Sequence, residues 1–187
     1  MTLFEFLAGM ISVILALAVA QLFLGLAGLV QSRAPVRYSV TQGAWIANLF
    51  VITFLHWWSL WDFRDLQWHF PMFFFSLLGP SLLFFAATLV SPRESSDDVI
   101  DLGQHFLKVR RPLMGVVLVM IVLMTLDGPL FGTEPAMHWL RIVEGVTVGS
   151  IAASLVFKDV RVHLMASLAV LAITGSVVVI RFFPLQM

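Results

Sequence analysis

The chain has 187 residues, of which 60% are hydrophobic and 12% charged, and its formal net charge is zero. A soluble domain carries about 25% charged residues and roughly half apolar ones, so this composition excludes an ordinary soluble globular protein. The zero net charge gives no basis for a nucleic-acid partner, and the lack of cysteine excludes disulfides, thiolate metal sites and cysteine nucleophiles.

Charged residues are confined to narrow gaps between long apolar runs. A helix needs about 20 mostly apolar residues to cross a hydrocarbon core of about 30 Å, and six runs of this kind fit the chain. The predicted spans are residues 5–30, 40–61, 70–91, 112–131, 139–157 and 162–181. We therefore predict an all-α integral membrane protein in which six transmembrane helices form one bundle over residues 1–187.

The segment between the second and third spans gathers tryptophan, histidine and charged residues. Such a mixture predicts a vestibule for a cation or a pocket for a ligand or partner, in which His56 would help to gate by pH. The candidate residues are His56, Trp57, Trp61, Asp62, Arg64, Asp65, His69 and, from a later gap on the same side, His138. The favoured alternative is a tryptophan belt at headgroup level beside an Asp–Arg–Asp turn closed by its own ion pairs. Haem or a divalent metal at these histidines is a further alternative, but no ligand spacing supports it, so we predict no cofactor and no metal.

The third span carries Gly79 and Pro80 near its middle. Proline lacks a backbone donor and clashes with the carbonyl four residues earlier, that of Ser76. We therefore predict a helix kink at Gly79 and Pro80 with one freed carbonyl, and interrupted helices of this kind occur at transporter sites.

The longest gap, between the third and fourth spans, has a helical pattern of its own. A Ser-Ser-Asp-Asp motif at residues 95–98 is typical of a helix start, and apolar residues follow at helical spacing before Pro112 opens the fourth span. We predict a short amphipathic helix over residues 97–109 on the cytoplasmic surface, with an ordinary connector as the alternative.

The fourth and fifth spans are short, which draws charged residues into the membrane. Only 15 uncharged residues separate Arg111 from Asp127, and Glu144 lies about 20 Å along a helix from Lys158. Arg141 is one turn from Glu144 and can pair with it. Because charges at membrane depth are costly and usually face the bundle interior, Asp127, Arg141 and Glu144 predict an ion or proton path; a structural ion pair is the alternative.

The fifth span continues this path as a polar stripe through Thr147 and Ser154. Beside the stripe, small residues form a row that lets another helix pack closely: Gly145, Gly149 and Ala153. This helix is therefore expected inside the bundle or at a subunit interface. In the sixth span His163, Ser167 and Thr174 share a face, which we interpret as contacts between helices.

The distribution of basic residues predicts the orientation. The gaps after the first, third and fifth spans hold eight of the eleven basic residues: Arg33, Arg37, Arg93, Lys108, Arg110, Arg111, Lys158 and Arg161. Basic residues are retained in the cytoplasm, so both termini are predicted on the non-cytoplasmic side. The expected location is the cell membrane, as for a multi-pass protein of the bacterial inner membrane.

Two functional hypotheses follow. The first is translocation of an ion, a proton or a small solute through a polar path in the outer half of the bundle, with the inner half as scaffold. The second is a non-transporting sensor or accessory subunit whose outer pocket binds a ligand or partner. A third class, an intramembrane enzyme or haem protein, has the least support, because the sequence carries no catalytic signature. The expected partners are the lipid bilayer, further copies of the chain in a closed homo-oligomer and, in the second hypothesis, a membrane partner subunit, but no nucleic acid.

Overall fold

The computed structural model describes residues 2–92, 99–131, 139–157 and 159–182, with the backbone alone at 127–129, 139–144, 177 and 179–182. The helices in this part are α1 Leu3–Gln31, α2 Val40–Ser59, α3 Phe70–Val90, α4 Leu102–Phe131, α5 Trp139–Val156 and α6 Val160–Phe182. The short 3-10 helix η1 (Leu60–Phe63) continues α2, and two short strands, β1 (Val36–Arg37) and β2 (Ile100–Asp101), lie in the connections. The all-α prediction is confirmed, and each predicted span lies within or close to one helix.

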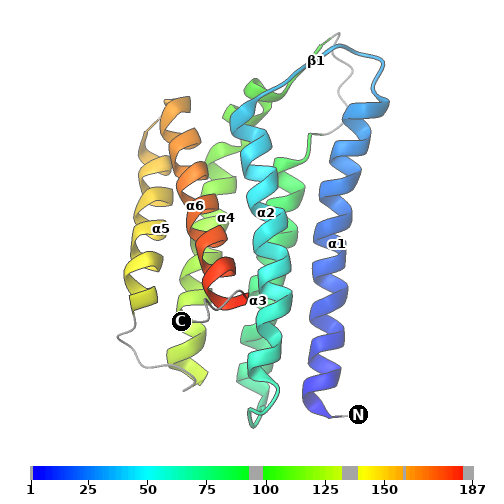
Figure 1. Ribbon diagram of the computed structural model, residues 1–187. Coiled ribbons are helices and arrows are strands. Elements are labelled where there is room, and N and C mark those ends of the chain that lie inside the picture. Colours follow the sequence, from blue (N-terminus) through cyan, green and yellow to red (C-terminus); the bar gives the residue numbers. More distant parts are fainter. Residues whose placement is uncertain (1, 93–98, 132–138, 158, 183–187) are drawn as a thin grey trace.

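The six helices form one bundle in which successive helices run in opposite directions (Figure 1). Around the bundle the order is α1, α3, α4, α5, α6 and α2, and each neighbouring pair in this ring is in contact. Helix α2 also contacts α3 and α4 across the ring. We call the end that carries β1 and β2 the inner end, and the end that carries η1 the outer end, after the predicted orientation.

Four helical segments are long and apolar enough to cross a membrane: Leu3–Gln31, Val40–Phe63, Phe70–Val90 and Leu102–Leu126. Helices α5 and α6 contribute shorter apolar segments, Gly145–Val156 and Val160–Ser176, within the described residues. These lengths support a transmembrane protein. For α5 and α6, crossing of the bilayer stays a prediction.

Local sequence signals explain where the helices begin. Thr2 and Glu5 form a capping box at α1, in which the Thr2 hydroxyl accepts from the Glu5 amide at 3.1 Å and the Glu5 carboxylate accepts from the Thr2 amide at 2.8 Å. Ser39 accepts from the Gln42 amide at the start of α2. Each cap pairs a backbone donor that the first helical turn leaves without a partner.

The prediction of a separate surface helix over residues 97–109 is wrong for the part that the structure describes. Residues 102–109 are the first turns of α4, which continues through Pro112 without interruption. Leu102 and Phe106 are buried in the bundle, because their spacing lets them pack on its core rather than lie on a membrane surface. Residues 97 and 98 lie outside the described residues.

The two strands join the first inner connection to the start of α4. They pair in parallel, with Val36 opposite Ile100 and Arg37 opposite Asp101. The Arg37 guanidinium lies 3.3 Å from the Asp101 carboxylate, whose other oxygen accepts from the Gln104 amide at 2.9 Å. Asp101 therefore stabilises the pairing of the strands and the first turn of α4 together.

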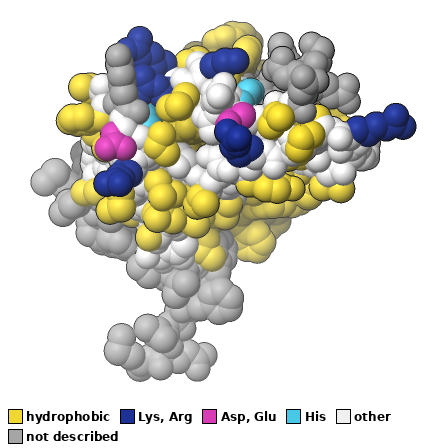
Figure 2. Space-filling view, turned by 90° about the horizontal axis from the view of Figure 1, so that it is seen from above, with side chains coloured by type: hydrophobic (Ala, Val, Ile, Leu, Met, Phe, Trp, Pro, Cys, Tyr) yellow, Lys and Arg dark blue, Asp and Glu magenta, His cyan; other side chains and the backbone are white. Residues whose placement is uncertain are grey.

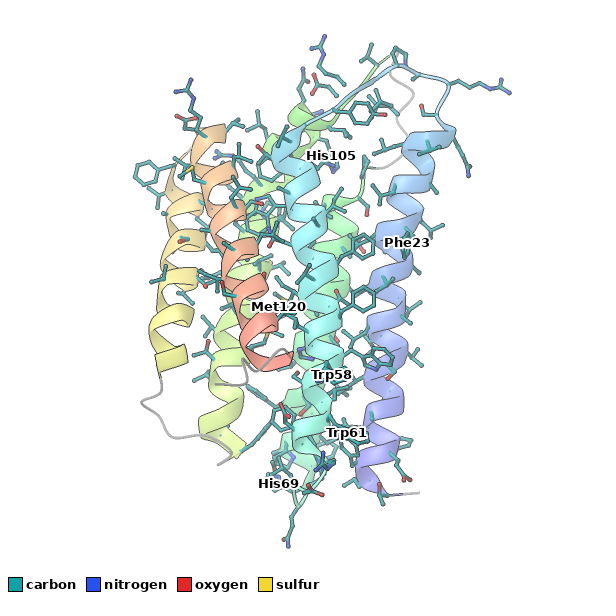
Figure 3. All side chains as sticks on the ribbon, viewed as in Figure 1. Phe23, Trp58, Trp61, His69, His105 and Met120 are labelled. Atoms are coloured by element: carbon teal, nitrogen blue, oxygen red, sulfur yellow. The ribbon has the colours of Figure 1, made fainter. Side chains whose placement is uncertain are left out.

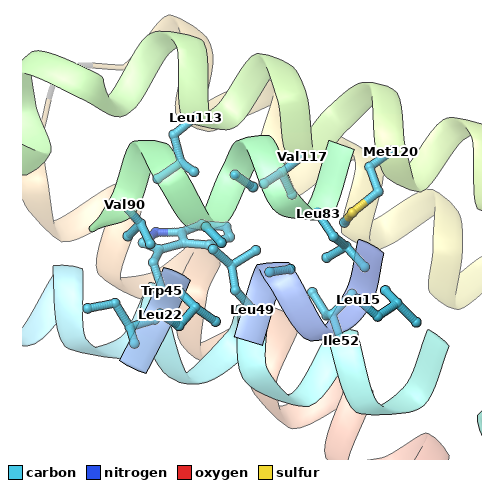
Figure 4. Packing of buried hydrophobic residues seen from close by; sticks show 14 of the residues in the cluster. Leu15, Leu22, Trp45, Leu49, Ile52, Leu83, Val90, Leu113, Val117 and Met120 are labelled. Carbon is cyan, nitrogen blue, oxygen red and sulfur yellow. The ribbon is translucent and has the colours of Figure 1, made fainter. Parts of the chain in front are cut away.

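The apolar core is contributed mainly by α1, α2, α3 and α4, and Ile151 of α5 and Val170 of α6 complete it (Figure 4). Trp45 is fully buried and belongs to the same cluster as Leu22 of α1, Val90 of α3 and Leu113 of α4. Helix α1 and the residue that caps α3 are close together at Gly25, where a Cβ atom would lie 2.7 Å from the Ser91 hydroxyl oxygen. The Ser91 hydroxyl donates to the Gln21 carbonyl at 3.1 Å, so this contact is polar as well as tight.

Candidate functional site

His56, predicted in an outer vestibule, is instead buried in the bundle. Its imidazole lies in the space that Gly79 leaves on α3, because a Cβ atom there would be 3.1 Å from its Cε1. Gly79 and Pro80 are also buried, and α3 continues through both residues. The structure thus joins two features that the sequence presented separately, while the kink itself stays a prediction.

The other outer candidates do not converge on one site. Trp57 and Trp61 are exposed, and the Trp57 indole donates to the Ser12 hydroxyl at 3.0 Å. Arg64 lies 3.2 Å from the Asp65 carboxylate and 5.3 Å from the Trp61 ring centroid. The arrangement supports the belt and the self-paired turn, because both tryptophan rings are exposed and the contacts of Arg64 are to its neighbours in the turn; Figure 3 shows Trp61 at the outer end.

Asp62 and His69 lie exposed on either side of this turn. His138 lies outside the described residues. Among the residues that the structure describes, no group of three or more histidine and acidic side chains is placed to hold a metal ion.

The predicted path on α5 is described only in part. The side chains of Asp127, Arg141 and Glu144 lie outside the described residues, so their pairing stays a prediction. Thr147 and Ser154 are buried on the side of α5 that faces the bundle, and the Ser154 hydroxyl donates to the Ser150 carbonyl at 3.0 Å.

The small-residue row of α5 makes no tight contact within the described chain. Gly145 and Gly149 are exposed, and a Cβ atom at either would meet nothing within 4 Å. Ala153 is partly buried. The predicted use of this row inside the bundle is therefore wrong for the two glycines, since they face outward, and its use between subunits stays a prediction.

The most extensive buried polar contact lies in the inner half, between α2 and α6. Asn48 is fully buried, and its Nδ2 donates to the Ser167 carbonyl at 2.9 Å, to the Ser167 hydroxyl at 3.0 Å and to the Ala44 carbonyl at 3.1 Å. Three oxygen acceptors around one nitrogen fix the orientation of this amide. The Asn48 Oδ1 atom is buried without a hydrogen-bond partner in the described structure.

One turn from Ser167 on the same face of α6, His163 meets Arg110 of α4. The Arg110 Nη1 atom donates to the Phe157 carbonyl at 3.0 Å and lies 3.4 Å from the His163 Nε2 atom. Arg110 is only 8% exposed and His163 is fully buried, with its ring 5.4 Å from that of Phe106. We call Asn48, Arg110, His163 and Ser167 the inner polar cluster.

Polar side chains from two helices also satisfy the end of α3. The Gln42 Nε2 atom donates to the Val90 carbonyl at 2.9 Å, and the His105 Nε2 atom lies 3.2 Å from the Leu89 carbonyl. His105 appears at the inner end in Figure 3. The last carbonyls of a helix have no partner within it, so α2 and α4 supply the missing donors.

Replacement of Gln42 by alanine is expected to lower the free energy of unfolding by about 2 kcal/mol, because it leaves the Val90 carbonyl unpaired and opens a cavity. Gln42→Leu should lose less, since leucine fills most of the volume. Exposed Gln104 provides the control, and Gln104→Ala should stay within about 0.5 kcal/mol of the wild type. Detergent-denaturant titration measures all three, and equal stability of Gln42→Ala and Gln104→Ala would contradict the assignment.

Sequence reasoning missed most of the inner polar cluster. The shared face of His163 and Ser167 is confirmed, but Arg110 counted only as a cytoplasmic charge and Asn48 was not singled out. A signal existed, because Asn48 is the only asparagine of the chain and lies inside a predicted span. The expectation that the inner half is scaffold stays a prediction.

Comparison with known proteins gives no relative from which a function could be carried over. No protein-family model matches the chain, and neither a curated protein nor a solved structure is significantly similar to it.

Proposed function

We propose that the chain is a six-span membrane protein that translocates a small solute or ion along a path between helices α2, α4, α5 and α6. The observation that carries the proposal is the inner polar cluster, where an arginine, a histidine and an asparagine are buried among apolar helices. Ionisable groups within membrane segments are expensive, and they mark substrate and ion pathways when they face a bundle interior.

The proposed path extends from the cluster along the buried face of α5. Ser154 and Thr147 lie on that face, and Glu144 and Asp127 are predicted farther toward the outer end. This path would reach both ends of the bundle. It also moves the functional centre inward from the outer half that the sequence indicated.

The proposed orientation has both termini on the non-cytoplasmic side of a bacterial inner membrane. It is supported by the alternating direction of the helices and by the basic side chains at the inner end, which Figure 2 shows in dark blue. Arg33, Arg37, Lys108, Arg111 and Arg161 are exposed there. Retention of basic residues in the cytoplasm favours this arrangement.

Flux into proteoliposomes tests the function directly. Wild-type protein is expected to carry protons, sodium, potassium, chloride or acetate faster than empty vesicles under an imposed gradient. Ser154→Leu should reduce that flux at least about tenfold, because leucine fills the buried face of α5 with apolar volume. Such a loss corresponds to about 1.4 kcal/mol in the transport barrier.

The matched control is Ser150→Leu, one turn away on the same helix. The Ser150 side chain is more exposed, and its hydroxyl donates to the Val146 carbonyl of its own helix. This variant should retain the wild-type flux. Absence of wild-type flux for all five ions, or equal flux in the two leucine variants, would count against the proposal.

A further inference from the structure

We propose that the inner polar cluster is a binding site for a small anion with oxygen or halide acceptors, with Arg110 as its charge partner. The part of this inference that makes the anion the transported solute rests on the proposed function, whereas binding itself does not.

The first argument is the charge of Arg110. A guanidinium stays protonated in proteins, and a partner of opposite sign stabilises a buried charge more than a neutral carbonyl does. Among the described residues, no carboxylate lies within 4.0 Å of Arg110, whose contacts are the Phe157 carbonyl and the His163 ring. A diffusible anion would supply the missing counter-charge.

The nearby acidic residues are engaged elsewhere. The Asp101 carboxylate pairs with Arg37 and caps α4. Asp159 is exposed at the start of α6, where its Oδ1 accepts from the Arg161 amide at 2.9 Å. Neither carboxylate forms an ion pair with Arg110, and the charge of Asp159 reaches His163 only as a longer-range electrostatic interaction.

The second argument is a buried donor on the far side of the imidazole that Arg110 contacts. Arg110 can only donate, so its contact with the His163 Nε2 atom requires a lone pair there and assigns the ring proton to Nδ1. The His163 Nδ1 atom is buried without a hydrogen-bond partner in the described structure. It is a donor in this tautomer and in the imidazolium form alike.

Ser167 adds a hydroxyl on the same face of α6. Its oxygen already accepts from Asn48, which leaves its proton available to donate. The one unpartnered acceptor of the cluster is the Asn48 Oδ1 atom. A permanent positive charge with two free donors favours an anion over a cation, which the guanidinium would repel.

The third argument is access from the inner face. On α4, the exposed residues Lys108 and Arg111 flank Arg110 in the sequence. Arg161, also exposed, lies in the first turn of α6. Basic side chains on the inner face, shown in dark blue in Figure 2, raise the local concentration of anions. The anion can be a free ion or the phosphate of a lipid headgroup, since both offer the same acceptor chemistry.

Thermal unfolding of the purified protein in a neutral maltoside detergent tests the site. Sodium chloride, acetate and phosphate are compared with sodium gluconate at equal ionic strength. A ligand that binds only the folded state raises the unfolding temperature, so at least one small anion should raise it by about 3 °C or more. The lipid comparison uses the protein in phosphatidylcholine vesicles with and without phosphatidylglycerol. Equal unfolding temperatures in all four salts, together with no rise on adding phosphatidylglycerol, would overturn the proposal.

Two neighbouring arginines give the matched variants. Arg110→Gln should abolish the rise, and Arg111→Gln, at an exposed position, should keep it. If Arg110→Gln does not fold, His163→Met replaces it, because methionine has a similar size and a weak sulfur acceptor but no donor. This variant should at least halve the rise. An undiminished rise in the variant that is used would also overturn the proposal.

The remaining comparisons identify the source of the anion and distinguish this inference from the proposed function. A rise with phosphatidylglycerol alone identifies a headgroup, and a rise with free ions identifies a soluble anion. Anion binding without flux would leave this inference standing and remove the proposed function. Flux of cations or protons without any anion-dependent rise in the unfolding temperature would remove this inference and leave the proposed function standing.

Discussion

Gly25→Leu is expected to lower the free energy of unfolding by about 3 kcal/mol, through collision of α1 with α3. A Cβ atom at Gly25 would lie 2.7 Å from the Ser91 Oγ atom, 2.8 Å from its Cβ atom and 3.3 Å from its Cα atom. Side chain and backbone of Ser91 are both in the way, so rotation of one side chain cannot relieve the overlap. Separation of the helices would also break the hydrogen bond from Ser91 to the Gln21 carbonyl.

Gly28, three residues farther along α1, provides the control. A Cβ atom there would meet nothing within 4 Å, so Gly28→Leu should stay close to the wild type. The measurement is unfolding in mixed micelles at increasing fractions of a denaturing detergent. If the two leucine variants unfold at the same fraction, α1 and α3 do not pack as described.

Gly79→Leu is expected to lower the free energy of unfolding by about 2–3 kcal/mol, because the new side chain would occupy the position of the His56 imidazole. A Cβ atom alone would lie 3.1 Å from Cε1 of that ring, 3.7 Å from Nε2 and 3.9 Å from Nδ1. Since the whole ring faces Gly79, the imidazole would have to leave its buried place between α2 and α3.

A double-mutant cycle isolates this contact. In a His56→Ala background, Gly79→Leu should cost at least about 1 kcal/mol less than in the wild type, because the space is then empty. Gly115→Leu on α4 is the control for leucine in a span, since a Cβ atom there meets nothing within 4 Å. Additive effects of His56→Ala and Gly79→Leu would show that the two residues do not share this space.

The inner polar cluster changes where function is sought in this protein. The sequence directs attention to the outer half, where aromatic and charged residues are conspicuous. The structure instead turns Trp57 and Trp61 outward and pairs Arg64 with its neighbour in sequence. Buried polar contacts between helices are better candidates than exposed ones, because they are costly to maintain without a role in packing or binding.

The sequence by itself determined the helices. Apolar runs of membrane-spanning length mark five of the six closely, because helix formation in an apolar run is a local property of composition and length. Helix α4 is the exception. Its first ten residues are polar enough to resemble a separate element, and only their packing against the core makes them continuous with the span.

The tertiary structure decided which residues meet. Asn48 and Ser167 are 119 residues apart in the sequence, yet they form the main polar contact between α2 and α6. The same holds for two further pairs that meet only in the folded structure, Gly25 with Ser91 and His56 with Gly79. In a membrane protein both lipid-facing and core-facing positions are apolar, so hydropathy cannot distinguish them. Partnership instead follows from the fit of small residues, bulky side chains and hydrogen-bonding groups between particular helix faces.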